Sequence, residues 1–311
     1  MTTLIFHSDI DRGGEWARCL RAELPDLDFR DWHAPGDDGD VTYALVWKAP
    51  HGELKRRFPK LKAILSLGAG VDHVFADPDL PEGVPVIRMV DPMLRQGMVE
   101  YALLHALSLL RQVPQLEAQQ RAREWVQLLA PPAQDCRVGV MGLGVLGGAI
   151  AKALADVGFP VRGWSRRAKD VPRIACFAGP DGLKPFLAGC DILVSVLPMT
   201  PETKNILDAG LFAQLPRGAG LINMGRGGQQ VEADILAALD SGQLSHAVLD
   251  VFQTEPLPQD HPFWTHPKVT ITPHIAAITY PHSGAKVVAG IIADIEAGRE
   301  PPNRVDPKAG Y

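Results

Sequence analysis

The sequence predicts an α/β protein with two domains, each built around a parallel β-sheet. Short apolar segments alternate along the chain with amphipathic helical segments, which is the pattern of parallel strands joined by crossover helices. The 311 residues are many for one hydrophobic core and are natural for two domains. An apolar fraction of 46% with 22% charged residues is typical of an ordinary globular protein.

The elements fall into two arrays, the second inserted into the first. In the first array, strands are expected at residues 4–7, 43–47, 61–68 and 84–89, with a helix at 15–24. A long helical stretch at 98–120, which Pro114 should bend or interrupt, leads into the second array. There, strands are expected at residues 138–141, 191–198, 219–225, 246–252 and 269–274, and a helix at 231–242. A last helix at 283–297 returns to the first array, which predicts one domain of residues 98–280 and another of residues 1–97 plus 281–311.

A glycine turn follows the strand at 138–141. Gly142, Gly144 and Gly147 match the pattern G-x-G-x-x-G and open a helix. The first glycine permits a tight turn, the second lets a pyrophosphate approach the backbone, and the third lets the helix pack closely on the strand. Free N–H groups at the start of the helix can then hold the diphosphate. In this context the motif predicts a dinucleotide site.

The end of the next strand indicates which dinucleotide is bound. NAD-binding sequences usually place an acidic residue there, but this chain reads Ser165-Arg166-Arg167, and the next acid is Asp170. Two arginines suit a 2′-phosphate through charge-assisted hydrogen bonds. We therefore expect NADP(H) to be preferred, with NAD(H) as the alternative, and a merely solvated basic turn as the competing interpretation.

Three polar residues stand at or just beyond predicted strand ends in apolar surroundings: Arg226, Glu255 and His274. Open α/β sheets bind ligands at the carboxyl ends of their strands. Reduction of a keto acid needs a cation for the carboxylate and carbonyl, an acid for the developing alkoxide, and a group that orients that acid. Arginine, histidine and glutamate supply these functions in turn. Taken singly, the arginine could be a structural ion-pair partner, a lone histidine is usually structural, and the glutamate could cap a turn, but together they predict a catalytic site.

These motifs, with LGAGVDHV, LPMTPETKNIL, LDVFQTEPLP, TPHIAA and the final AGY, carry a resemblance over nearly the whole chain. The sequence resembles the D-isomer-specific 2-hydroxyacid dehydrogenase family, and within it the bacterial reductases of glyoxylate and hydroxypyruvate. The resemblance implies two Rossmann-like or flavodoxin-like domains with a cleft between them. The flavodoxin-like domain would bind substrate and the Rossmann domain the dinucleotide. It also implies a homodimer formed through the helix near 98–120.

The resemblance also implies roles for individual residues. Arg226 would bind the substrate carboxylate and keto oxygen, His274 would be the general acid, Glu255 would hydrogen-bond His274, and Asp250 would face the nicotinamide carboxamide. Further cofactor contacts are expected from Val145, Leu146, Leu197, Pro198, Thr203, Met224 and Gly225. Backbone N–H groups of Gly68, Ala69 and Gly70 would hold the substrate carboxylate, and Trp47 would form part of the substrate wall. Many relatives have alanine at position 225, and the glycine is expected to add backbone freedom without removing a functional group.

The expected function is NADPH-dependent reduction of small 2-keto acids: glyoxylate to glycolate and hydroxypyruvate to D-glycerate. One alternative is a dehydrogenase of broader specificity for D-2-hydroxy acids, and another is a non-enzymatic NAD(P)-binding regulator. A net charge of −5 argues against a nucleic-acid partner. The four cysteines lack metal-ligand spacing, so no metal is expected. No apolar run reaches the roughly 18 residues of a membrane span, and the N-terminus lacks a signal-peptide pattern, which together predict the cytoplasm.

Overall fold

The computed structural model describes residues 2–306, which form two compact units. The first unit comprises the chain up to Leu94 together with the chain from Ile278 onward, and the second comprises Arg95–Ala277. The boundaries expected from the sequence lie three residues further along the chain. Helix α4 (Pro92–Leu110) runs through the first boundary, so no break in the apolar pattern marks it. The final AGY of the sequence lies outside the described residues.

The first unit contains a five-stranded sheet in the order β2-β1-β3-β4-β5. Its strands are β1 (Thr3–His7), β2 (Asp28–Asp31), β3 (Tyr43–Val46), β4 (Ala63–Ser66) and β5 (Val86–Ile87). All neighbouring strands are parallel. This order is that of flavodoxin-like sheets, as expected. The edge strand β2 was not predicted, because its sequence DFRD has one apolar residue and its side chains are only partly buried.

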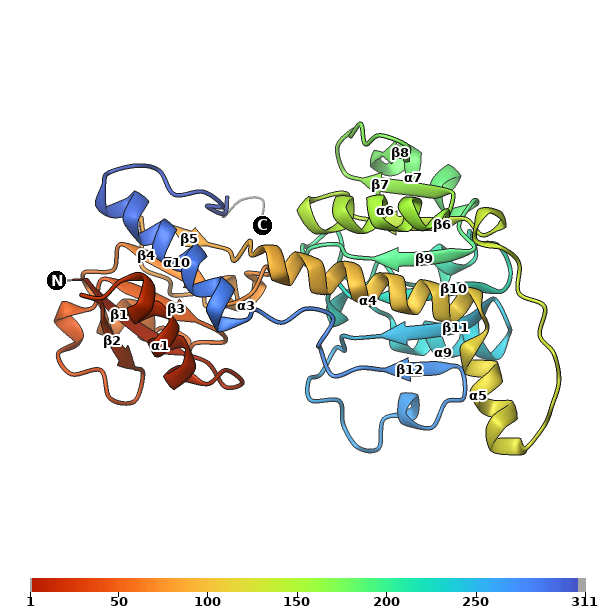
Figure 1. Ribbon diagram of the computed structural model, residues 1–311, viewed down its shortest axis with the longest axis horizontal. Helices are drawn as coiled ribbons and strands as arrows, with labels where there is room; N and C mark the ends of the chain where they lie inside the picture. Colours follow the sequence, from red (N-terminus) through yellow and green to blue (C-terminus); the bar gives the residue numbers. More distant parts are fainter. Residues whose placement is uncertain (1, 307–311) are drawn as a thin grey trace. The chain divides into compact units, whose positions relative to one another are not determined.

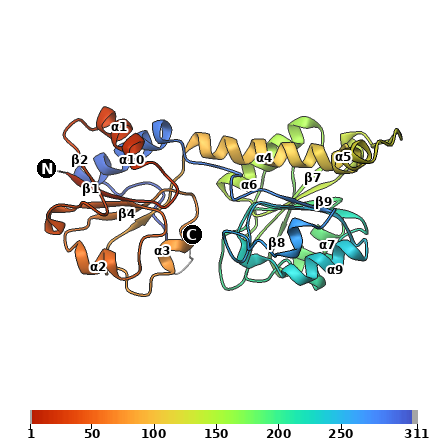
Figure 2. The ribbon, with the colours of Figure 1, turned by 90° about the horizontal axis from the view of Figure 1, so that it is seen from below.

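Helices cover both faces of this sheet, with α1 and α10 on one side and α2 and α3 on the other (Figures 1 and 2). Their bounds are α1 (Gly13–Glu23), α2 (Glu53–Arg57), α3 (Asp72–Phe75) and α10 (Pro281–Glu296). The close packing of α1 on α10 depends on a glycine, since a Cβ atom at Gly284 would lie 2.5 Å from the ring of Trp16. Trp16 itself is fully buried.

The second unit contains a seven-stranded sheet in the order β12-β11-β10-β9-β6-β7-β8. Its strands are β6 (Val138–Met141), β7 (Val161–Ser165), β8 (Ala175–Ala178), β9 (Ile192–Ser195), β10 (Ala219–Asn223), β11 (Leu244–Leu249) and β12 (Val269–Ile271). All pairings are parallel. Read from β8, this is the 3-2-1-4-5-6 order of dinucleotide-binding sheets with one strand added beyond β11. The predicted α/β fold with two parallel sheets is confirmed.

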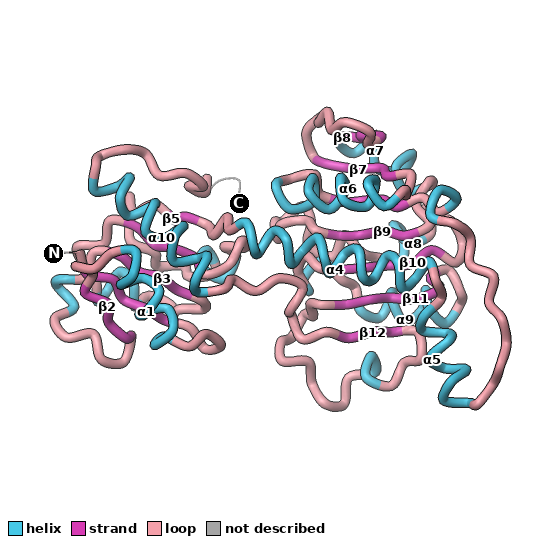
Figure 3. Tube along the Cα trace, viewed as in Figure 1, coloured by secondary structure: helices cyan, strands magenta, loops and turns pink. Residues whose placement is uncertain are grey.

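Helices α4 and α6 lie on one side of this sheet, and α7 and α9 lie on the other (Figure 2). The helices are α5 (Val113–Ala122), α6 (Val145–Val157), α7 (Gly179–Leu187), α8 (Ala209–Phe212) and α9 (Glu232–Asp240), in addition to α4. The stretch predicted at 98–120 is two helices (Figure 3). The break falls before Pro114, at Gln112, whose φ of 56° is left-handed, and Pro114 lies in the first turn of α5. Proline is tolerated there because its missing N–H is not needed.

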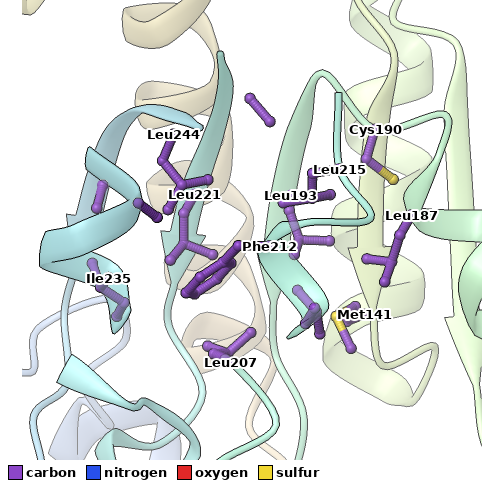
Figure 4. Close-up of a cluster of buried hydrophobic side chains, with 14 of the residues drawn as sticks. Met141, Leu187, Cys190, Leu193, Leu207, Phe212, Leu215, Leu221, Ile235 and Leu244 are labelled. Atoms are coloured by element: carbon purple, nitrogen blue, oxygen red, sulfur yellow. The ribbon is translucent and has the colours of Figure 1, made fainter. Parts of the chain in front are cut away.

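One apolar cluster fills the space between the sheet and helices α7, α8 and α9 (Figure 4). Leu193 and Leu221 from the strands meet Phe186 of α7, Phe212 of α8 and Ile235 of α9, all fully or almost fully buried. On the opposite face, a Cβ atom at Gly220 would lie 2.8 Å from Leu109 of α4, so that helix also packs directly on the strands. A sheet buried on both faces explains why its strands are continuously apolar in sequence.

Because all the strands are parallel, their carboxyl ends share one edge of the sheet, to which the arrowheads of β9, β11 and β12 point in Figure 1. The predicted site residues of this unit come from the turns at that edge. Within residues 2–306, no helix is long and apolar enough to cross a membrane. The same residues contain no cluster of three or more His, Cys, Asp and Glu side chains that could hold a metal ion.

Candidate active site

The glycine turn between β6 and α6 is fixed by backbone geometry. Gly142 has a φ of 106°, a conformation that favours glycine, and its N–H donates to the carbonyl of Trp164 on β7 at 2.8 Å. A Cβ atom at Gly147 would lie 1.7 Å from the carbonyl oxygen of Gly142. The first glycine therefore makes the turn, and the third lets α6 start directly against it.

The start of α6 has the features that a dinucleotide diphosphate requires. A Cβ atom at Gly144 would meet no atom within 4 Å, so the backbone beside it is open to a ligand. Val145 and Leu146 are the first residues of the 13-residue helix α6, whose leading N–H groups have no partner within the helix. These groups and the positive end of the helix dipole suit an anion. The residues present therefore fit a dinucleotide.

The end of β7 carries the residues expected to select the cofactor. Ser165 is the last residue of the strand and is buried, and its hydroxyl donates to the carbonyl of Arg167 at 2.7 Å. This bond folds the chain back, while Arg166 and Arg167 are exposed. The turn thus presents two guanidinium groups and no acidic side chain directly after the strand.

The turn after β9 contains three of the expected cofactor-lining residues. The hydroxyl of Thr203 donates to the carbonyl of Pro198 at 2.7 Å and accepts from the N–H of Thr200 at 2.8 Å. Leu197 is buried. The Thr203 hydroxyl thus shapes this turn, and the contacts of these residues with the cofactor stay a prediction.

Arg226 lies on the turn that follows β10. Before it, the N–H of Met224 donates to the carbonyl of Ser195 at 3.1 Å, and the N–H of Gly225 donates to Oδ1 of Asn223 at 3.1 Å. Arg226 Nη1 donates to the carbonyl of Gly225 at 2.9 Å. The Arg226 side chain is half-buried, and a network of side-chain amides holds the backbone of this residue.

Besides the backbone freedom expected of Gly225, the structure shows a steric constraint at this position. Its φ is outside the left-handed region, and the reason for glycine is space. A Cβ atom there would lie 2.6 Å from Oε1 of Gln229 and 3.0 Å from the carbonyl oxygen of Leu197. Glycine is therefore required by packing in this chain.

His274 and Glu255 are in direct contact, with Nδ1 of His274 at 2.8 Å from Oε2 of Glu255. The side chains are 32% and 24% exposed. The other carboxylate oxygen of Glu255 accepts from the N–H of Phe252 at 3.1 Å, so the carboxylate is itself fixed. His274 has a φ of 55°, a left-handed conformation that is uncommon outside glycine and is concentrated at functional sites.

Asp250 anchors the loop that carries His274. Its side chain is almost fully buried, and its two carboxylate oxygens accept from the Thr272 hydroxyl at 2.6 Å and from the N–H groups of Ile275 and Ala276 at 2.8 Å each. The Asp250 carbonyl also accepts from the N–H of His274 at 2.8 Å. The contact with the nicotinamide carboxamide stays a prediction.

A further turn expected to bind substrate lies in the first unit. The Ser66 hydroxyl accepts from the N–H of Gly68 at 3.2 Å and donates to the carbonyl of Gly70 at 3.1 Å, spanning the turn that contains Ala69. A Cβ atom at Gly68 would lie 2.7 Å from the ring of Trp47. The Trp47 indole therefore packs directly against the turn.

The matching family model is described as the D-isomer specific 2-hydroxyacid dehydrogenase, NAD binding domain, and it matches residues 103–276. The chain belongs to the D-isomer specific 2-hydroxyacid dehydrogenase family. The resemblance predicted from the sequence is thereby confirmed.

Similar proteins within this family cover the chain from end to end. The glyoxylate/hydroxypyruvate reductase A of Serratia proteamaculans is 44% identical, with 99% of each chain covered. The protein of the same name from Yersinia enterocolitica is 41% identical, with the same coverage.

Among solved structures, a D-isomer specific 2-hydroxyacid dehydrogenase from Xanthobacter autotrophicus Py2 in complex with NADPH and MES is 45% identical. It has a TM-score of 0.96, with 100% of this chain and 99% of that chain covered. A NADPH-dependent glyoxylate/hydroxypyruvate reductase from Sinorhizobium meliloti in complex with NADP and sulfate is 41% identical. Its TM-score is 0.95, and both chains are covered completely.

The predicted site of this dehydrogenase is supported by residues that the sequence did not indicate. Thr272, whose hydroxyl joins Asp250 to the hydroxyl of Tyr101 at 2.7 Å, was not singled out. Gln229 and Asn223, which hold the Arg226 turn, were also not recognised. A usable signal was present for Asn223, a polar residue at the end of an apolar strand, but none marks Gln229.

Proposed function

We propose that this dehydrogenase reduces small 2-keto acids with NADPH, converting glyoxylate to glycolate and hydroxypyruvate to D-glycerate. The single observation that carries the proposal is the contact between His274 Nδ1 and Glu255 Oε2, on the sheet edge that also bears Arg226 and the glycine turn. The names of the full-length relatives support the choice of substrates.

The roles of the side chains follow from their chemistry. Nδ1 of His274 faces a carboxylate, so Nε2 is the atom that gives its proton to the keto oxygen. Glu255 holds the imidazole in that orientation. Arg226 offers two parallel N–H groups to the substrate carboxylate and polarises the carbonyl. NADPH held at the glycine turn would supply the hydride for the carbonyl carbon, and the proton from His274 completes the hydroxyl.

We also propose that backbone N–H groups of residues 68–70 bind the substrate carboxylate and that Trp47 restricts the size of the substrate. The support is the shape of the turn, which Ser66 holds from inside and the indole covers from one side. A Trp47→Ala variant should raise KM for glyoxylate and accept longer keto acids. An unchanged specificity would remove Trp47 from the proposal.

The preference for NADPH is proposed from the exposed guanidinium groups of Arg166 and Arg167 and from the lack of an acid at the end of β7. NADPH and NADP are bound in the similar solved structures. The test compares kcat/KM for NADPH and NADH in the wild type and in Arg166→Ala/Arg167→Ala. We expect the double variant to lose efficiency with NADPH and to change little with NADH. A wild-type preference for NADH would contradict the proposal.

A panel of glyoxylate, hydroxypyruvate, pyruvate and longer 2-keto acids distinguishes the proposed reductase from a dehydrogenase of broader specificity. We expect kcat/KM to be highest for the first two. Comparable values across the panel would favour the broader activity. Absence of turnover with every acid, while NADPH still binds, would favour the non-enzymatic regulator instead.

We further propose that the protein is a homodimer in the cytoplasm. Between residues 104 and 129, in α4, α5 and the segment after them, which has no helix or strand over residues 124–132 (Figure 3), five large apolar side chains are exposed: Leu104, Leu116, Trp125, Val126 and Leu129. Trp125 is 97% exposed, which is unfavourable for a lone chain in water. Light scattering should give twice the mass of the chain, and Trp125→Asp/Leu129→Asp should halve it. Fractionation of cells tests the location.

A further inference from the structure

Two consecutive glutamines, Gln229 and Gln230, are fully buried directly after the Arg226 turn. Buried amides are stable only when their donors and acceptors are bonded. Gln229 meets this condition by reaching two turns. Its Oε1 accepts from the N–H of Arg226 at 3.2 Å, and its Nε2 donates to the carbonyls of Leu197 and Pro198 at 2.9 and 3.0 Å. One side-chain amide therefore joins the Arg226 turn to the turn after β9.

Gly225 leaves the space that the side-chain amide of Gln229 occupies. A Cβ atom at position 225 would lie 2.6 Å from Oε1 of Gln229, closer than packed atoms tolerate. The amide and a larger residue at 225 therefore cannot both occupy this space without a shift. A shift of the amide would disturb its bond with the N–H of Arg226, which donates to the same oxygen.

We propose that Gln229 is a positioning residue for the reaction, which sets the place of Arg226 relative to the turn after β9, and that Gly225 is required because Gln229 is present. The inference rests on the proposed role of Arg226. Loss of the amide leaves the N–H of Arg226 and the carbonyl of Leu197 without this partner, and leaves the carbonyl of Pro198 with its bond from Thr203, so the two turns lose their link and move to regain partners. A displacement of about 1 Å at a substrate-orienting group can cost about 10²-fold in rate.

Gln230 provides a matched control. It is equally buried and lies in the same turn, but its Oε1 accepts from Nδ2 of Asn223 at 2.8 Å and its Nε2 donates to the carbonyl of Val251 at 3.1 Å. Its amide thus bonds neither Arg226 nor the turn after β9 directly, and it reaches the Arg226 turn only through Asn223. Removal of either amide should reduce stability, and removal of the Gln229 amide should disturb the chemistry much more.

The first experiment compares Gln229→Leu with Gln230→Leu by Tm, by the Kd for NADPH, and by kcat and KM for glyoxylate. We expect similar decreases in Tm. We expect kcat/KM to fall about 10²-fold in Gln229→Leu, with a higher KM for glyoxylate, and to stay within about threefold in Gln230→Leu. Equal kinetic losses in the two variants would mean a purely structural role and would overturn the proposal.

The second experiment combines Gly225→Ala with Gln229→Ala and does not depend on the leucine variant folding. Gly225→Ala should lower kcat/KM at least about tenfold in the wild-type chain, and less than about threefold in the chain that already carries Gln229→Ala, because the closer contact, with Oε1 of Gln229, is then gone and only the 3.0 Å contact with the Leu197 carbonyl remains. Independent, multiplicative losses would overturn the pairing, as would a harmless Gly225→Ala in the wild type.

Arg226→Ala, measured alongside, separates this inference from the proposed function. If Arg226→Ala retains its activity, the proposed function itself is wrong. If Arg226→Ala loses activity and Gln229→Leu keeps it, only the positioning role of Gln229 is wrong.

Discussion

His274 contacts Glu255 through its ring and is fixed through its backbone as well: Nδ1 of the histidine lies 2.8 Å from Oε2 of the glutamate, and the backbone N–H of His274 donates to the carbonyl of Asp250. The second contact, with a φ of 55° at His274, fixes the direction in which the ring leaves the chain. The first fixes the rotation of the ring. The histidine is therefore oriented before any substrate arrives, a condition for efficient proton transfer.

We expect His274→Ala to lower kcat by about 10²–10⁴-fold, because the proton donor is lost while the glycine turn is untouched. Glu255→Gln should lower kcat less, since the imidazole remains and keeps a hydrogen-bonding neighbour. Steady-state kinetics with glyoxylate measures both, and quenching of protein fluorescence shows whether NADPH still binds. A near-normal kcat in His274→Ala would remove the histidine from the mechanism.

Thr272→Val should lower the stability of the protein and its kcat. The Thr272 hydroxyl donates to Asp250 at 2.6 Å and lies 2.7 Å from the hydroxyl of the buried Tyr101. Burial is also the main cause that raises the pKa of Tyr101 above its usual range. Valine would leave two buried polar groups without this partner, at a cost of about 1–3 kcal/mol in the free energy of unfolding. Urea denaturation measures the loss.

The control for that variant is Thr272→Ser, which keeps the hydroxyl and should stay close to the wild type in stability and kcat. If serine is as damaging as valine, the methyl group matters and the hydrogen-bond chain does not explain the effect.

Gly147→Ala should abolish binding of NADPH or prevent folding, whereas Gly148→Ala should have little effect. A Cβ atom at 147 would lie 1.7 Å from the carbonyl oxygen of Gly142, and one at 148 would meet no atom within 4 Å. Both residues lie in α6, so helix propensity alone would favour alanine at each. Titration with NADPH and thermal unfolding distinguish the variants. Equal behaviour would show that α6 can move away from the turn.

The free energy of unfolding should fall as the pH is lowered from about 7 to 4. Burial, with lesser contributions from His266 and His105, lowers the pKa of His246 to about 4. The unfolded chain binds a proton at this residue near pH 6.5 and the folded chain does not, so acid favours unfolding by up to about 3 kcal/mol. His246→Gln should flatten this slope in urea titrations at several pH values. An equally steep slope in the variant would assign the effect to other groups.

The sequence predicted those parts of the fold that depend on local patterns. The strand at 138–141, the glycine turn and the apolar strands of both sheets could be read from alternation and spacing alone. The edge strand β2 was missed because it is polar. The interruption expected at Pro114 lies at Gln112 instead, because Pro114 is part of the first turn of the second helix. In both cases a tertiary or capping effect overrode the simple pattern.

The site residues could be expected from the sequence because their side-chain types are rare at the ends of apolar strands. Their supporting residues could not. Gln229 contacts Leu197, which is 32 residues away in the chain, and Thr272 contacts Tyr101 across 171 residues. Such contacts depend on the order of strands in the sheet, which no local spacing contains.

The turns that carry the predicted site residues of the second unit all lie at one edge of its sheet, which has a practical consequence. The opposite edge of that sheet contains turns such as those at Gly158 and Gly218, where a Cβ atom would meet nothing within 4 Å. A peptide tag or linker introduced there would attach the protein to a sensor surface or a scaffold at the edge of this sheet opposite to the glycine turn, Arg226 and the proton donor His274.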